Sequence, residues 1–145
     1  LWSRGLGDVY KRQGEAMSKT GLAKAIAFGV VDNIGPLGCL VAISGLYLIC
    51  SILTEMISNN AVAAVMGPLA YEMALQFDAN PIPFILAVMF GASASFSTPI
   101  GYQTNTYVYN AGGYKFKDFV KVGLPLNLLL WVIFTCAIGW LYPLK

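Results

Sequence analysis

The sequence predicts an all-α polytopic membrane protein, and three observations lead to this fold class. Hydrophobic residues make up 57% of the 145 residues, whereas charged residues make up only 11%. A soluble domain usually carries about 25% charged residues, so most of this surface is not suited to water. Stretches without charge recur along the chain, and two polar clusters interrupt them. The uncharged stretches predict helices in a lipid bilayer, and the clusters predict functional sites within it.

The first residues do not share this pattern. Residues 3–13 are polar and basic and have no apolar segment behind them, so they are not a signal peptide. Every residue matches the translation of a transposase-type sequencing adapter, and a natural cytoplasmic loop is the alternative. We therefore expect residues 1–13 to be non-native and residues 14–145 to be the C-terminal fragment of a longer polypeptide. Residues 1–13 hold three of the nine basic and one of the seven acidic residues. The remainder is formally neutral, so no nucleic-acid partner is expected.

Cysteine and histidine usage excludes several chemistries. Cys39, Cys50 and Cys136 lie singly in apolar stretches, without metal-binding spacing, and the chain contains no histidine. A Ser-His-Asp triad, a Cys-His pair and a histidine metal site are therefore excluded within this chain. We expect no organic cofactor.

The first half of the chain predicts an amphipathic segment followed by a helical hairpin. Residues 15–31 alternate apolar and lysine positions, which favours an interfacial helix, and residues 32–36 form a turn signal. Residues 37–53 carry no charge and reach roughly 25 Å as a helix. A short polar tip, residues 54–60, separates them from a second apolar arm at 61–77. This order predicts a helix, a tip and a second helix.

The second half predicts a broken helix and a last span. Residues 84–114 carry no charge, yet their centre is polar and contains Pro99, which removes a backbone donor. We therefore expect a discontinuous helix, whose irregular backbone must be buried or line a cavity. Residues 122–141 form the last span. Lysines at 115, 117 and 121 precede it and predict a cytoplasmic loop, in which Asp118 is expected to be solvated.

Two polar clusters are the candidate functional residues. The tip cluster comprises Thr54 and residues 58–60, and the break cluster comprises residues 97–105. Hydroxyl, amide and freed carbonyl oxygens suit sodium, whereas N–H groups at helix N-termini suit anions. The two clusters together predict a site that binds an anion and sodium. Glu55 either acts directly in this site or orients the tip by hydrogen bonds.

The motifs at residues 54–68 and 91–127 resemble the divalent anion–sodium symporter family, which includes sodium-coupled dicarboxylate, citrate and sulfate carriers. The resemblance covers essentially all of residues 14–145. It implies two inverted repeats, each with a re-entrant hairpin and a discontinuous helix. Residues 14–145 would be the second transport repeat, completed by a missing N-terminal repeat and commonly found in a homodimer. We expect a multi-pass protein of the bacterial inner (plasma) membrane.

The resemblance also assigns site residues. The family's hairpin motif is Ser-Asn-Thr, and here Asn60 stands in place of the threonine, which suits a smaller or differently shaped anion such as sulfate. The implied residues are substrate-binding Asn59, Asn60, Thr98 and Pro99 and sodium-binding Thr54, Ser58, Asn59 and Ser97. From the polar clusters themselves, Glu55, Gln103 and Asn105 are expected to support the site.

These observations predict sodium-coupled symport of a divalent anion, and not an enzyme. The alternatives are a sodium-independent anion permease of the arsenite-efflux type and an intramembrane enzyme with a serine or threonine nucleophile. Such an enzyme would have only Glu55 as a base. A purely structural membrane subunit would leave the polar broken helix without a role.

Overall fold

The structure is a computed structural model that describes residues 37–142. The segments predicted at 1–13 and 15–31 lie outside this range. Every element within it is a helix, which confirms the all-helical prediction. The helices are α3 (Cys39–Thr54), α4 (Asn59–Gln76), α5 (Pro81–Ser93), α6 (Gln103–Gly112) and α7 (Phe116–Leu141).

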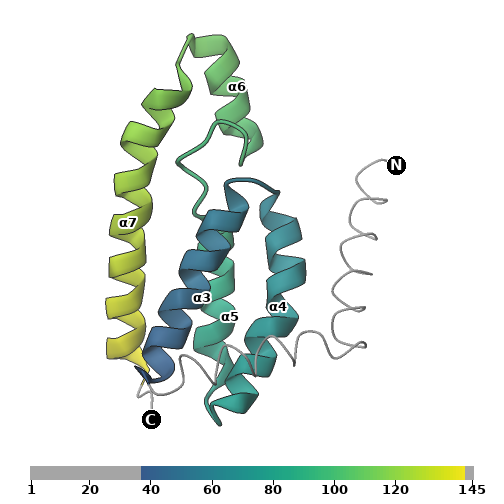
Figure 1. The fold of residues 1–145 in the computed structure, drawn as a ribbon, viewed down its shortest axis with the longest axis vertical. Helices are drawn as coiled ribbons and strands as arrows, with labels where there is room; N and C mark the ends of the chain where they lie inside the picture. The colour runs from purple at the N-terminus through teal and green to yellow at the C-terminus, as the bar shows by residue number, and fades with distance from the viewer. Residues whose placement is uncertain (1–36, 143–145) are drawn as a thin grey trace.

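Helices α3 and α4 form an antiparallel pair joined by a four-residue turn (Figure 1). Helix α3 has no charged residue and measures roughly 24 Å at 1.5 Å per residue. Ser58 ends the turn as the N-cap of α4, where its hydroxyl accepts a hydrogen bond from the Ala61 N–H at 3.3 Å. The turn places the polar tip at one end of the helix pair.

Helix α5 packs against both α3 and α4 and supplies much of the core. Asn80 caps its start by accepting a hydrogen bond from the Ile82 N–H at 3.0 Å, and Pro81 occupies the first turn, where a missing N–H costs nothing. Phe84 is fully buried, and Tyr47 of α3 is only 2% exposed. Helix α5 ends at Ser93, and the irregular segment 94–102 leads to α6.

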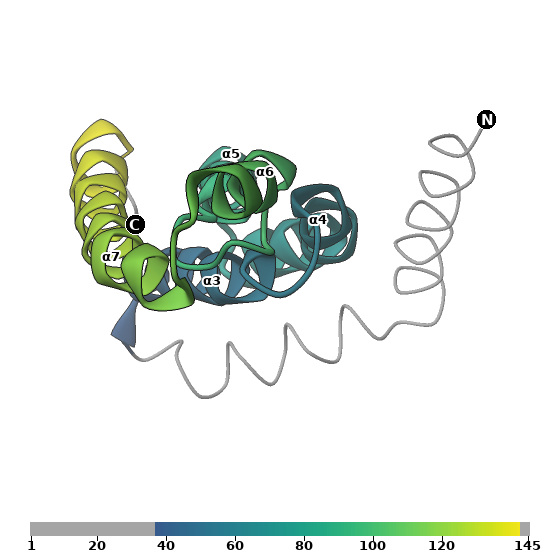
Figure 2. The ribbon, with the colours of Figure 1, turned by 90° about the horizontal axis from the view of Figure 1, so that it is seen from above.

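Helix α7 is the longest of these five helices and lies beside α3, on the side away from α4 (Figure 2). Tyr47 of α3 stacks on Phe134 of α7, with ring centroids 4.8 Å apart. By length and composition, α7 is the one helix within residues 37–142 that could cross a membrane by itself. Most of its apolar side chains are exposed, which suits contact with lipid or with further protein.

The predicted lysine loop is partly wrong. Helix α7 begins at Phe116, so Lys117 and Lys121 lie in its first turns. Asp118 stabilises this early start, because its carboxylate accepts a hydrogen bond from the Lys115 N–H at 2.8 Å. Gly113 ends α6 in the left-handed conformation (φ 65°), which leaves only a short turn between the helices.

Candidate functional site

The tip cluster and the irregular segment lie against each other at the same end of the helix bundle (Figure 1). The tip follows the C-terminus of α3, and the irregular segment follows the C-terminus of α5. Gly101 permits their close approach, because an added Cβ would lie 2.8 Å from the Thr54 carbonyl oxygen and 3.2 Å from the Glu55 Cα. Two regions about 40 residues apart in sequence therefore form one polar site.

Glu55 makes the largest set of contacts at this junction. Its Oε1 accepts hydrogen bonds from the N–H groups of Phe96 (3.0 Å) and Ser97 (2.8 Å). Its Oε2 accepts from the Thr98 N–H at 2.8 Å. Hydrogen bonds to a charged acceptor are among the strong ones, so one carboxylate fixes three consecutive peptide groups. These contacts are of the kind expected for the orienting role of Glu55, and both roles stay predictions.

The Thr98 hydroxyl completes this connection. It donates to the Glu55 carbonyl oxygen at 2.9 Å and accepts from the Gly101 N–H at 3.2 Å. The hydroxyl predicted to contact substrate is therefore already bonded on both sides. The neighbouring Pro99 is buried, and its carbonyl oxygen accepts from the Thr106 hydroxyl at 2.6 Å.

Thr54 lies at the centre of a group of oxygen atoms and is fully buried. Its Oγ1 is 2.6 Å from Asn59 Oδ1 and 2.7 Å from the Ala92 carbonyl oxygen, close to the last turn of α5. The Thr54 carbonyl oxygen in turn accepts from the Ser95 hydroxyl at 3.3 Å. These contacts bring two predicted residues, Thr54 and Asn59, together with carbonyl oxygens that the sequence did not single out.

The remaining tip residues are more open. Asn59 is partly exposed, whereas Ser58 and Asn60 are exposed. Asn59 and Asn60 occupy the first two positions of α4, where backbone N–H groups have no partner within the helix. No acceptor among residues 37–142 contacts these two N–H groups.

The predicted supporting residues of the break cluster are held differently. The Asn105 amide donates to the carbonyl oxygens of Ser95 (2.9 Å) and Thr98 (3.2 Å), so it fixes the irregular segment onto α6. Gln103 is exposed at the first position of α6. Ser97, a predicted sodium ligand, is a buried residue of the irregular segment.

One residue of the site was missed by the sequence analysis. Asn127 of α7 donates from Nδ2 to Glu55 Oε1 at 2.8 Å and to Ser97 Oγ at 2.9 Å. The available signal was a lone amide within an otherwise apolar span, which is uncommon unless the amide has a partner.

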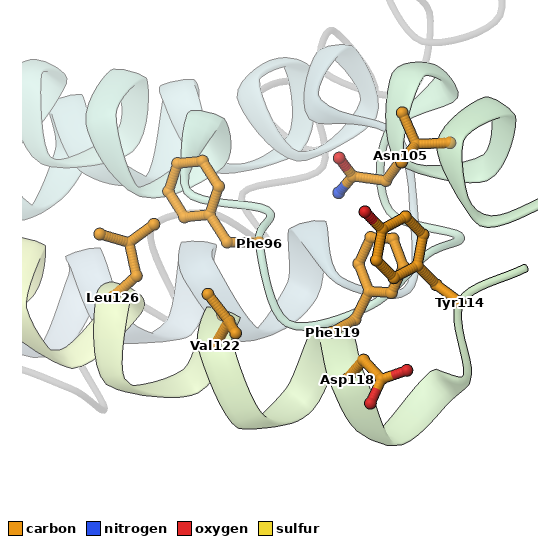
Figure 3. A pocket seen from close by; sticks show the side chains of 9 residues that line it. Phe96, Asn105, Tyr114, Asp118, Phe119, Val122 and Leu126 are labelled. Carbon is orange, nitrogen blue, oxygen red and sulfur yellow. The ribbon is translucent and has the colours of Figure 1, made fainter. Parts of the chain in front are cut away.

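A separate pocket of about 310 Å³ lies on the other face of the irregular segment, between α6 and α7 (Figure 3). Aromatic and aliphatic side chains form most of its wall, and Asn105 is the one predicted site residue that lines it. The tip residues do not contribute. We therefore place the candidate site at the junction of tip and irregular segment, not in this pocket.

The chemistry of the junction is that of oxygen ligands and helix termini. Within the part of the chain that the structure describes, no group of three or more acidic or cysteine residues could hold a metal ion. The C-terminal end of α5 presents carbonyl oxygens and the N-terminal end of α4 presents N–H groups, and the two ends meet around Thr54 and Asn59. Helix dipoles make the first end favourable for a cation and the second for an anion.

Comparison with known proteins gives the family. The sequence profile of the citrate transporter family matches residues 6–89. Its first matched residues fall inside the segment expected to be non-native, and the boundary at residue 13 stays a prediction.

Relatives among characterised and uncharacterised proteins agree with the profile. The chain is 43% identical over 117 residues to an uncharacterized transporter of Synechocystis. The alignment covers 81% of the chain and 19% of that transporter. The chain is 34% identical over 128 residues to an uncharacterized transporter of Escherichia coli (88% and 21%). It is also 34% identical over 119 residues to sodium/sulfate cotransporter 1 of Chlamydomonas reinhardtii (81% and 14%).

The chain spans about a fifth of the length of the first two relatives. The names are those of transporters and not of enzymes, as the sequence predicts. The chain therefore belongs to the citrate transporter family of integral membrane proteins, and its resemblance to the divalent anion–sodium symporters is confirmed.

Proposed function

We propose that the full-length protein containing this chain is a secondary active transporter that carries a divalent anion, a dicarboxylate or sulfate, together with sodium. In this proposal the chain is the second of two inverted repeats. Helices α3 and α4 form its re-entrant hairpin, and α5 and α6 are the halves of its discontinuous helix. Family membership and the sodium/sulfate cotransporters among its relatives support the proposal.

The observation that carries sodium coupling is the surroundings of the Thr54 hydroxyl. One hydroxyl proton faces two acceptors, Asn59 Oδ1 at 2.6 Å and the Ala92 carbonyl oxygen at 2.7 Å. One of these oxygen pairs therefore has no proton between its atoms. Two oxygen atoms that face each other without a proton repel one another. Either a rotated Asn59 amide or a bound cation relieves this repulsion. Sodium takes oxygen ligands of this kind, and the C-terminal end of α5 favours positive charge.

The proposed sodium ligands are Thr54, Ser58, Asn59 and Ser97, together with freed backbone carbonyl oxygens. The anion would lie at the N-terminal end of α4. There Asn59 and Asn60 supply side-chain amides and backbone N–H groups without partners among residues 37–142.

Glu55 already occupies the N–H groups of residues 96–98, so these do not serve the anion. Thr98 and Pro99 remain in the proposal as substrate-side residues, with Gln103 at the start of α6. A bare anion within a membrane is costly to desolvate, and nearby sodium reduces that cost. This is the physical reason for coupling the two fluxes.

The rest of the binding site would come from a first repeat of the same polypeptide. We further propose a homodimer in a bacterial plasma membrane, in contact with lipid along the exposed face of α7. The homodimer and the membrane location follow from the resemblance to the symporter family.

The test is uptake of labelled sulfate and succinate by cells or vesicles that contain the full-length protein. We expect uptake to require sodium and Asn59→Ala to abolish it without loss of expression. Asn110→Ala is the matched control, because Asn110 is an exposed amide on α6. Undiminished uptake by Asn59→Ala would contradict the site. Uptake that ignores sodium but responds to a proton gradient would instead favour a permease of the arsenite-efflux type.

A further inference from the structure

Helix α7 touches the candidate site at two positions on one face, Gly123 and Asn127, which lie four residues apart. At Gly123 the helix backbone lies directly on the irregular segment. An added Cβ would overlap the Phe96 carbonyl group and lie 2.6 Å from the Ser97 Cα. This approach brings Asn127, one turn later, within hydrogen-bond distance of the site.

The Asn127 amide joins two residues that otherwise belong to different elements. One N–H bonds to Glu55 Oε1, at the end of the hairpin's first arm, and the other bonds to Ser97 Oγ, in the irregular segment. The same Glu55 oxygen accepts from the N–H groups of Phe96 and Ser97. Asn127 therefore contacts both sides of the junction at once.

The orientation of this amide is determined by its partners. A rotated amide would place Oδ1 against the Glu55 carboxylate, which is repulsive. In the observed orientation Oδ1 is buried and has no hydrogen-bond partner among residues 37–142. An unsatisfied buried acceptor is costly and uncommon, so a packing role alone does not account for asparagine at this position.

We propose that Asn127 is a positioning residue of the ion and anion site. From α7 it holds the Glu55 carboxylate and the Ser97 hydroxyl, and thereby fixes the irregular segment against the hairpin tip. The functional meaning of the residues it positions rests on the proposed function. It follows that α7, the tip and the irregular segment form one unit, although α7 contributes no predicted ligand.

The first readout is hydrogen exchange in the full-length protein, because it needs no transport. In Asn127→Leu, which has a similar size and no donor, the backbone N–H groups of residues 96–98 should exchange roughly tenfold faster, as expected for loss of a hydrogen bond to a charged group. Asn127→Asp should have a larger effect, since it places a second carboxylate beside Glu55. Asn127→Ser, which keeps one donor, should fall between wild type and Asn127→Leu, and it carries the comparison if the leucine variant does not fold.

Thr135→Val is the matched control. Thr135 also joins α7 to the bundle, through a 3.0 Å hydrogen bond to the Ser44 hydroxyl, but does not contact the irregular segment. We expect its exchange at residues 96–98 to match wild type. Equal acceleration by Thr135→Val, or no acceleration by the Asn127 variants, would overturn the proposal.

The second readout is the sodium concentration that gives half-maximal uptake. Asn127→Leu should raise this half-saturating sodium concentration roughly tenfold, because the sodium ligands are displaced. The maximal rate at saturating sodium should change little, because the ligands themselves are still present. A lower maximal rate with an unchanged sodium requirement indicates a purely structural residue and overturns the proposal. If wild-type uptake ignores sodium, the proposed function fails, and the exchange measurement still decides the role of Asn127.

Discussion

The hairpin tip and α6 are neighbouring polar regions, yet the structure holds them in opposite ways. Thr54 is fully buried, and the Glu55 carboxylate accepts four hydrogen bonds. Helix α6 has no buried residue, and Gln103 at its start is exposed. The start of the tip, Thr54 and Glu55, is therefore organised by bonds within the chain, whereas Gln103 of α6 and Asn60 of the tip present polar groups outward. Substitutions in the first group should change the site itself, and those in the second should change what the site selects.

The largest effect is expected at Glu55. Glu55→Ala leaves the N–H groups of residues 96–98 and the Asn127 amide without their acceptor, and each unsatisfied group costs about 1–3 kcal/mol. We expect a lower melting temperature of the purified protein and no measurable uptake. Glu55→Gln keeps one acceptor oxygen but points an N–H at another donor, so it should be only partly milder. Normal uptake by Glu55→Ala would show that the irregular segment does not depend on this carboxylate.

A smaller but clear effect is expected where α7 meets the irregular segment. Gly123→Ala forces a backbone shift at Phe96, at a cost of about 1–3 kcal/mol, and should lower both the melting temperature and the uptake rate. Gly139→Ala lies on the same helix, and its new Cβ would sit 3.4 Å from a Leu40 methyl group, which is an ordinary contact. Thermal unfolding of the two variants side by side gives the comparison. Equal melting temperatures would contradict the close approach.

The smallest effect on stability is expected at Asn60. Asn60→Thr restores the threonine of the symporter family's hairpin motif at an exposed position, so stability should change by less than about 0.5 kcal/mol. The anion preference should shift toward succinate and away from sulfate, as measured by competition against labelled substrate. An unchanged anion preference would show that Asn60 does not determine which anion is selected.

Much of the helical layout was predictable from charge and hydrophobicity. The uncharged stretch 37–53 and the apolar arm 61–77 correspond closely to α3 and α4, because apolar runs and the polar turn between them are local signals. The start of α7 was not predicted, since lysines suggested a loop. The stabilising hydrogen bond from the Lys115 N–H to the Asp118 carboxylate depends on geometry at the helix end.

The candidate site was predictable in composition but not in its connections. Thr54, Asn59 and Ser97 were identified as polar groups at a tip and a break. The contact between Glu55 and Asn127 was not predictable, because the two residues are 72 positions apart and meet only when α7 packs on the irregular segment. Local sequence patterns carry no information about such a contact.

The oxygen atoms around Thr54 are the proposed ligands of the coupling sodium. The most direct measurement is the sodium dependence of uptake by Thr54→Val in the full-length protein, with Ser51→Ala as control. Ser51 is one turn earlier on α3, is also buried, and donates to the Ala94 carbonyl oxygen at 3.3 Å outside the Thr54 oxygen group. We predict that Thr54→Val raises the half-saturating sodium concentration by roughly tenfold or more, as for loss of a ligand worth over 1.4 kcal/mol, while Ser51→Ala leaves it unchanged. The same sodium dependence in wild type and Thr54→Val would contradict a sodium site at Thr54.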